Sequence, residues 1–103
     1  MSLASPGPEI RVAIPRALHS LCEFSPHSPH PELTLRGADV RALLADLLRR
    51  YPQVHVRLCD ERGDPRPHIN VFVNDDHVRA RAGLDTPLAE GDLVSLLPAV
   101  SGG

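Results

Sequence analysis

The amino-acid sequence predicts a single α+β domain in which a mixed sheet packs against one main helix. Apolar residues alternate with other residues over 9–14 and again over 69–73, which is typical of half-buried strands. Between them, residues 40–51 place apolar side chains at steps of three and one, the pattern of one helical face. The chain has 103 residues, enough for one domain, and 42% of them are hydrophobic, enough to fill one core.

The first half of the chain is predicted to contain two strands set between loops. Residues 1–8 hold two prolines and a glycine, which predicts a flexible lead. The first strand covers 9–14 and ends before a proline. The stretch SPHSPHP at 25–31 contains three prolines and is expected to be a loop, and a short second strand follows at 33–36. The segment 53–67 mixes charges with glycine and proline and is predicted to be mostly connection.

The most regular element is a helix that follows Asp39, a residue suited to cap its N-terminus. Its predicted apolar stripe consists of Val40, Leu43, Leu44, Leu47, Leu48 and Tyr51. Asp46 lies off this stripe, and Arg49 and Arg50 suit the negative end of the helix dipole. Pro52 is expected to end the helix.

The C-terminal half is predicted to supply the remaining strands. Residues 69–73 form a strand, a turn follows at 74–76, and 77–79 return as a short partner strand. A tight turn at 90–92 precedes the final strand at 93–97, which is apolar on both faces and is therefore expected, like the first strand, to be central. One helix covers only one face of such a sheet. This order of elements is that of the β-grasp, or ubiquitin-like, fold.

The end of the chain does not help to form the fold. The domain is expected to span 9–98, followed by a flexible tail at 99–103 that ends in Gly102-Gly103. Glycine has no side chain to bury and loses the most backbone freedom on ordering. When extended, the tail reaches about 17 Å at ~3.4 Å per residue, enough to enter a narrow channel in a partner. We therefore expect the carboxylate of Gly103 to be the working group.

The sequence resembles the C-terminal half of the ubiquitin-like sulfur-carrier proteins of the MoaD/ThiS type in two segments, HINVFVNDDHVR and GLDTPLAEGDLVSLLPAVSGG. These comprise the small subunit of molybdopterin synthase, the thiamine-pathway carrier and a carrier for cysteine biosynthesis in actinobacteria. The matching features are the strand end VND at 73–75, the turn at 88–92, the strand at 94–98 and Gly102-Gly103. The ending LLPAVSGG is closer to the molybdopterin and cysteine carriers than to the thiamine carrier.

The resemblance implies a carrier that is not itself an enzyme and that binds no cofactor. An E1-like enzyme would use ATP to adenylate Gly103, and a sulfur nucleophile would displace AMP to leave a thiocarboxylate. Ala99, Val100 and Ser101 would then lie in the active site of the partner. The implied partners are this activating enzyme, a biosynthetic enzyme that accepts the sulfur (for cysteine, molybdopterin or a specialised metabolite), and a JAMM-type metalloprotease.

Two other functions stay open at this point. The chain could be a ubiquitin-like modifier that is conjugated through Gly103 to lysines of other proteins, or an interaction domain with an inert tail. A carrier exchanges one oxygen for sulfur, whereas a modifier forms conjugates of higher mass. The chain contains no lysine, so it cannot be extended through a lysine side chain of another copy.

Phe72 is a candidate for a surface that docks a partner. Its side chain points away from the face formed by Ile69, Val71 and Val73. Together with Leu96 or its neighbours, Phe72 would form an apolar patch that docks the activating enzyme. The alternative is that Phe72 packs under a loop or against Cys59.

Other kinds of chemistry find little support in the sequence. Cys22 and Cys59 fit neither a disulfide framework nor a zinc ribbon and are expected to be reduced thiols rather than nucleophiles. His27 and His30 have no further ligand at metal-site spacing, and the other four histidines are expected at the surface or at edges. A net charge of −2 gives no reason to expect nucleic acid or a membrane as a partner. No secretory signal is visible, which predicts a cytoplasmic protein.

Overall fold

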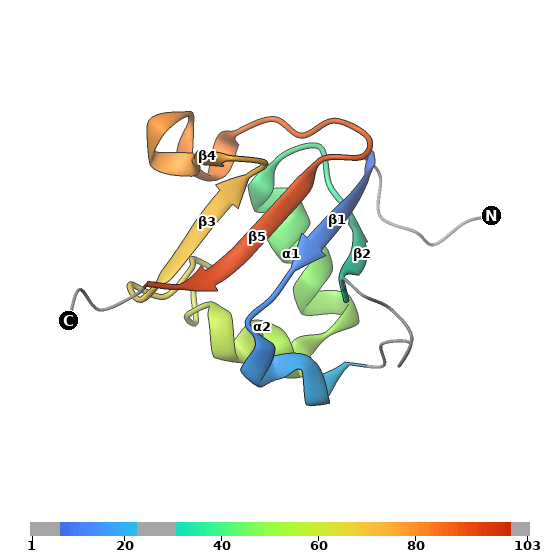
Figure 1. Ribbon diagram of the computed structural model, residues 1–103, viewed down its shortest axis with the longest axis vertical. Helices are drawn as coiled ribbons and strands as arrows, with labels where there is room; N and C mark the ends of the chain where they lie inside the picture. The colour runs from blue at the N-terminus through green and yellow to red at the C-terminus, as the bar shows by residue number, and fades with distance from the viewer. Residues whose placement is uncertain (1–6, 23–30, 100–103) are drawn as a thin grey trace.

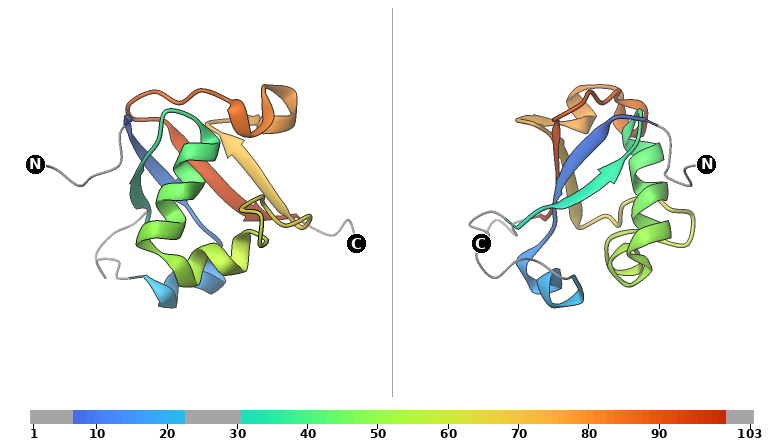
Figure 2. Two further views of the ribbon diagram at one scale, coloured as in Figure 1. Left: turned by 180° about the vertical axis from the view of Figure 1, so that it is seen from behind. Right: turned by 90° about the vertical axis from the view of Figure 1, so that its right-hand side faces the viewer.

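The computed structural model describes residues 7–22 and 31–99. The described strands are β1 (Glu9–Ala13), β2 (Leu33–Arg36), β3 (Ile69–Val73), β4 (Asp76–His77) and β5 (Leu93–Pro98). There are two α-helices, α1 (Val40–Arg50) and α2 (Pro52–Leu58). The short 3-10 helix η1 (Arg16–Leu21) follows β1, and η2 (Val78–Ala80) and η3 (Gly83–Asp85) lie between β4 and β5. The sheet lies in front of α1 in Figure 1, and the reverse view in Figure 2 shows α1 across its back face, with α2 at the lower end of α1.

The order of strands in the sheet is β2-β1-β5-β3-β4. β1 pairs antiparallel with β2 and parallel with β5, and β5 pairs antiparallel with β3. The first and last strands therefore lie inside the sheet, as their apolar sequences predict. The prediction of a mixed sheet on one main helix, in the β-grasp arrangement, is confirmed.

The hydrophobic core lies between the sheet and the two helices. β1 contributes Ile10 and Val12 and β5 contributes Val94, all of them fully buried. From the helical side, Leu47 of α1 and Val54 of α2 are equally inaccessible. Burying an aliphatic side chain of this size stabilises the fold by roughly 1.5–3 kcal/mol, so this layer holds the sheet to the helices.

The start of α1 agrees with the prediction. The Asp39 carboxylate accepts a hydrogen bond from the Ala42 backbone N–H at 2.7 Å, which satisfies one of the free donors of the first turn. Four residues of the predicted apolar stripe are buried, Tyr51 is partly buried, and Leu48 at the edge is 50% exposed. Leu48 therefore does not belong to the core.

Asp46 of α1 is buried, although the sequence places it off the apolar stripe. Its side chain is 2% exposed. One carboxylate oxygen accepts a hydrogen bond from the backbone N–H of Arg36 at 2.9 Å. The carboxylate also forms ion pairs with Arg49 at 2.6 Å and Arg50 at 3.4 Å. Because Arg36 belongs to β2, Asp46 fastens the edge strand to the main helix.

The prediction that residues 53–67 are mostly connection is wrong for the first part of this segment, where the chain forms α2. Pro52 ends α1 but also occupies the first turn of α2, a position that needs no backbone N–H. Val54 and Leu58 are four residues apart and both enter the core. A helix of seven residues gives too short a pattern to be recognised by its period.

The return strand predicted at 77–79 is also shorter than expected. β4 ends at His77, and the chain turns into η2 at Val78.

Of the flexible lead predicted at residues 1–8, residues 1–6 lie outside the described residues. The carbonyls of Gly7 and Pro8 accept hydrogen bonds from the Arg36 side chain and the Gly37 N–H. Within the described segments, none of the helices has the length and apolar character needed to cross a membrane.

Candidate functional site

The predicted site depends on how β5 delivers the end of the chain. β5 is paired in parallel with β1 as far as Ser95 and antiparallel with β3 as far as Pro98. Beyond it, the backbone N–H of Ala99 donates to the carbonyl of His68 at 2.6 Å, and Ala99 itself is exposed. The chain is therefore held in the sheet up to Ala99. The predicted site residues Val100, Ser101, Gly102 and Gly103 lie outside the described residues.

The start of β5 is fixed by the turn at 90–92. Gly91 adopts φ +86°, a conformation that favours glycine. Its N–H donates to the carbonyl of Glu9 at 3.1 Å, and the N–H of Arg11 donates to the carbonyl of Asp92 at 3.0 Å. This turn thus sets the register between β5 and β1, and with it the point at which the chain leaves the sheet.

A second connection ties the same turn to β3. The Asn74 side-chain amide donates to Asp92 Oδ1 at 3.3 Å, and Asn74 Oδ1 accepts from the Leu93 N–H at 3.1 Å. Asn74 has φ 54°, the left-handed conformation that asparagine tolerates in tight turns. Both residues are predicted in turns, but the sequence does not predict the link between them, because two turn residues 18 positions apart form no local pattern.

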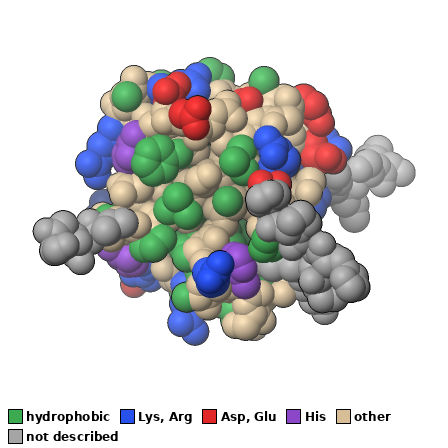
Figure 3. Space-filling view, viewed as in Figure 1, with side chains coloured by type: hydrophobic (Ala, Val, Ile, Leu, Met, Phe, Trp, Pro, Cys, Tyr) green, Lys and Arg blue, Asp and Glu red, His purple; other side chains and the backbone are tan. Residues whose placement is uncertain are grey.

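Phe72 lies on the outer face of the sheet, as predicted. It pairs with Ser95 in β5, and its ring meets the His77 ring edge-on with centroids 5.1 Å apart. Cys59 is in the core on the helical side, so the alternative that Phe72 packs against Cys59 is not what the structure shows. Figure 3 shows apolar side chains gathered in the middle of this face.

Of the patch predicted for Phe72 with Leu96 or its neighbours, the choice of Leu96 is wrong. Leu96 pairs with Val71, faces the helices with it and is only 2% exposed. The neighbouring Leu97 is 40% exposed and shares the outer face with Phe72, because successive side chains of a strand alternate. The apolar patch, defined from here on as Phe72 and Leu97, is thus displaced by one residue from the prediction.

Both cysteines are free thiols, Cys22 partly and Cys59 fully buried. Burial raises the pKa of Cys22 and raises that of Cys59 to about 11, where the Asp60 carboxylate adds to the shift and Arg66 opposes it. A thiol with a raised pKa is neutral near pH 7 and a poor nucleophile. These surroundings agree with the expectation of inert thiols.

Three of the described histidines are buried or lie within hydrogen-bond distance of other residues, which the sequence does not predict. His55 is buried, 6% exposed, and this burial lowers its pKa while the Asp60 carboxylate opposes the shift. His19 Nε2 lies 3.2 Å from the Ile14 carbonyl, and His77 Nε2 lies 3.1 Å from Asn70 Oδ1. Among the described residues, no three histidine, cysteine or acidic side chains are grouped as a metal site would require. His27 and His30 lie outside them.

Comparison with known proteins identifies the family. The ThiS family model matches residues 29–103. The sulfur carrier protein CysO of Mycobacterium tuberculosis is 35% identical over 97 residues, which cover 91% of this chain and 98% of the relative.

Solved structures show the same fold. The structure of the Amycolatopsis orientalis BexX/CysO complex matches with a TM-score of 0.72 and 32% identity, covering 91% of this chain and 99% of the other. The small archaeal modifier protein 1 of Methanosarcina acetivorans matches with a TM-score of 0.71 and 29% identity, covering 93% and 97%. Because the family model matches well over half of the sequence and a CysO relative aligns along nearly all of it, the chain belongs to the ThiS family.

Proposed function

We propose that this protein is a sulfur carrier that holds sulfur as a thiocarboxylate on Gly103. The observation that carries the proposal is the identity of 35% to a sulfur carrier protein along 91% of the chain. The geometry of β5 supports it, because pairing with β3 as far as Pro98 and the hydrogen bond from Ala99 to His68 give the tail a fixed point of departure at Ala99. The family match runs on through residue 103.

The chemistry follows from the weakness of a carboxylate as an electrophile. Attack of the Gly103 carboxylate on ATP would release pyrophosphate and form an acyl-adenylate. Hydrosulfide would then attack the acyl carbon and expel AMP, which leaves the thiocarboxylate after loss of a proton. The thiocarboxylate sulfur would attack an acceptor and displace its leaving group, and water would hydrolyse the resulting thioester, which restores the carboxylate and leaves the sulfur on the acceptor. The carrier contributes the acyl group and its presentation, and the activating partner supplies the nucleotide site.

This proposal requires at least two partners. An E1-like enzyme would bind ATP and dock on the Phe72 and Leu97 patch while the tail enters its active site. A biosynthetic enzyme would receive the sulfur, and a JAMM-type metalloprotease would act on carriers with residues beyond the diglycine. The Amycolatopsis relative was solved in complex with a second protein, BexX, which supports a function exercised in complexes.

A second function is favoured by the likeness to an archaeal modifier protein, with its TM-score of 0.71. In that case the activated Gly103 would be attacked by a lysine amine of another protein and would form an isopeptide bond. Both functions share the adenylation step, so only the final product separates them.

The test is the intact mass of the protein purified from its own host without thiols. A sulfur carrier gives a species heavier by the difference between one sulfur and one oxygen atom. Methionine oxidation adds almost the same mass, so the species must also react with a thioacid-selective alkylating reagent and disappear on deletion of Gly103. Higher-mass conjugates would establish the modifier instead. Unchanged mass with no conjugates would overturn both.

A further inference from the structure

One edge of the sheet stops short of its neighbour. β3 has five residues, but its ladder with β4 consists of only two pairs, Phe72↔His77 and Val73↔Asp76. After His77 the chain turns away into η2, where the Arg79 N–H donates to His77 Nδ1 at 3.0 Å. The half of β3 from Ile69 to Val71 therefore has a strand neighbour only on the side of β5.

The hydrogen-bond pattern shows which residue faces this open edge. The Ala99 N–H donates to His68 and the Asn74 N–H donates to Leu93, so even-numbered residues of β3 bond to β5. The odd-numbered residues direct their backbone groups away from β5. The N–H of Ile69 is taken by the Arg66 carbonyl at 2.9 Å. Val71 thus presents its backbone groups at the point where β4 has ended.

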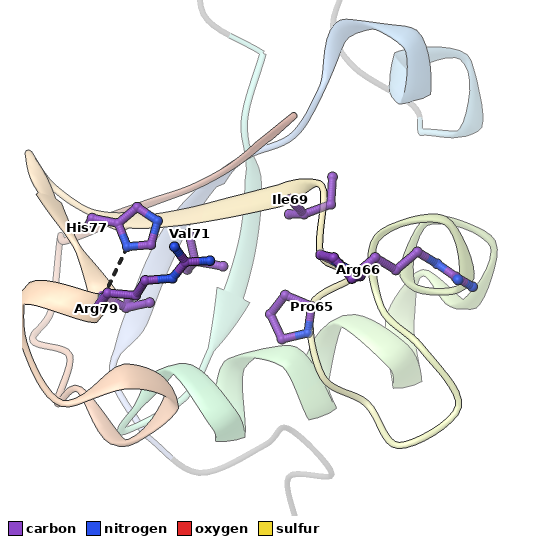
Figure 4. Close-up of a pocket in the computed structure, with 8 residues that line it drawn as sticks. Pro65, Arg66, Ile69, Val71, His77 and Arg79 are labelled. Atoms are coloured by element: carbon purple, nitrogen blue, oxygen red, sulfur yellow. Dashed lines mark hydrogen bonds between the residues drawn. The ribbon is translucent and has the colours of Figure 1, made fainter. Parts of the chain in front are cut away.

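A pocket of about 190 Å³ lies beside this edge. Figure 4 shows it between β3, the segment that follows α2 and the chain that leaves β4. Its apolar lining comes from Pro65, Pro67, Ile69, Val71 and Val78. The pocket has room for one aliphatic side chain beside the edge of the strand.

The charge around the pocket is positive. Arg66 and Arg79 both line it, and none of its described lining residues is acidic. The Arg66 guanidinium points away from the pocket in Figure 4 and donates to the carbonyl of Val56, at 2.9 and 3.3 Å, so the positive charge over the pocket is that of Arg79. The Arg79 guanidinium forms no ion pair or hydrogen bond within residues 7–22 and 31–99, and Figure 4 shows it extending over the pocket. Such a rim is complementary to a carboxylate.

At the opposite edge of the sheet, side chains of α1 bind backbone groups of β2, which distinguishes that edge from the open edge of β3. On β2, the Arg36 N–H is bound by Asp46 and the Thr34 carbonyl accepts from the Arg50 side chain at 3.3 Å. Side chains of α1 thus occupy the backbone groups of that edge, a common protection against unwanted strand pairing.

We propose that the edge of β3 from Ile69 to Val71 binds an extended, acidic peptide segment of a partner protein. The segment adds a strand to the sheet, inserts one aliphatic side chain into the pocket and places a carboxylate on Arg79. Ala99 pairs with His68, directly before Ile69, so a partner held here lies beside the point where the chain leaves toward Gly103. Only this last consequence depends on the proposed sulfur-carrier function.

In the test, an amide-capped hexapeptide, TVIVDD, is added to the full-length protein. The changes in the backbone amide chemical shifts of the protein are measured. We expect shifts at Ile69–Val71 and at Val78–Arg79, and none at Thr34–Arg36. The matched peptide TVIVKK reverses the charge, and TVPVDD cannot pair as a strand, because proline lacks the N–H. Both should bind at least about tenfold more weakly.

Two variants test whether the positive charge of Arg79 binds the peptide. Arg79→Glu should weaken TVIVDD by about tenfold, whereas Arg81→Glu, an equal charge change at an exposed residue outside the pocket, should change it less than about twofold. Equal binding of TVIVKK, shifts centred on Phe72 and Leu97, or no shifts at millimolar peptide would overturn the proposal. Deleting Gly103 should leave peptide binding unchanged. Loss of peptide binding and loss of thiocarboxylate formation are therefore separate results.

Discussion

Among single residues, Cys59 has the side chain whose chemistry the fold changes most plainly. It follows α2, is 2% exposed and belongs to the core. Burial raises the pKa of its thiol from the ordinary value of 9.0 to about 11, with Asp60 adding to the shift. The fold therefore treats this cysteine as a small apolar residue, and its thiol takes no part in the sulfur chemistry proposed for Gly103.

This shift predicts how stability depends on pH. A folded-state pKa above the unfolded one stabilises the protein fully below the unfolded value, and this stability is lost as pH rises. Between about pH 9 and 11 the unfolded chain releases a proton that the folded chain keeps, so the free energy of unfolding should fall. Urea unfolding at pH 8 and pH 10 measures the loss, in a Cys22→Ala background that removes the other thiol. Adding Cys59→Ala should make the dependence shallower; an unchanged slope contradicts the prediction.

Among the elements, β2 and α1 are joined by a short connection in which Gly37 lies close to the helix backbone. Gly37 is buried, and a Cβ at this position would stand 2.5 Å from the backbone nitrogen of Leu43, closer than real contacts allow. The glycine therefore lets the strand approach the helix directly, and Asp39 can cap α1 two residues later. This close approach places Asp46 within reach of the β2 edge.

Gly37→Ala should therefore destabilise the protein strongly. The clash is with backbone, which cannot move aside as a side chain would, so we expect a loss of more than about 2 kcal/mol in the free energy of unfolding. Gly63→Ala is the matched control: its φ of +86° costs about 1 kcal/mol, but nothing lies within 4 Å of the added atom. Chemical denaturation compares the two variants. If Gly63→Ala costs as much as Gly37→Ala, the close approach is not what requires glycine at position 37.

The elements that could be predicted from sequence are those with a complete local pattern. α1 shows a full apolar stripe with a cap, and β1 and β3 alternate over five residues each. α2 is not predicted, because its seven residues contain only two apolar core residues, Val54 and Leu58. Leu96 was placed on the wrong face because Leu97 is apolar as well, so only the register with β3 decides which side chain turns inward. The burial of Asp46 depends on a partner in another element, which no local pattern reveals.

For the whole molecule, the two faces differ in what they offer a partner. The outer face of the sheet carries the Phe72 and Leu97 patch, of which Leu97 lies on β5, the strand that leads into the tail. The helical side also exposes apolar side chains, with Leu48 50% and Val56 56% exposed. Exposure alone does not separate these surfaces. Their positions in the chain do, because Leu97 lies two residues before Ala99, the last described residue, whereas Leu48 and Val56 lie on the helices.

This difference predicts that the outer face, and not the helical side, controls activation. Leu97→Asp should slow thiocarboxylate formation by the activating enzyme about tenfold, because it buries a charge in an apolar contact, while stability falls by less than about 1 kcal/mol. Val56→Asp introduces the same charge at a more exposed position on α2 and should leave the rate unchanged. Initial rates of Gly103 charging, followed by mass, test both variants beside their melting temperatures. Equal rates for the two variants would show that the enzyme does not read the sheet face, whereas a slower Val56→Asp protein would place the contact on the helices.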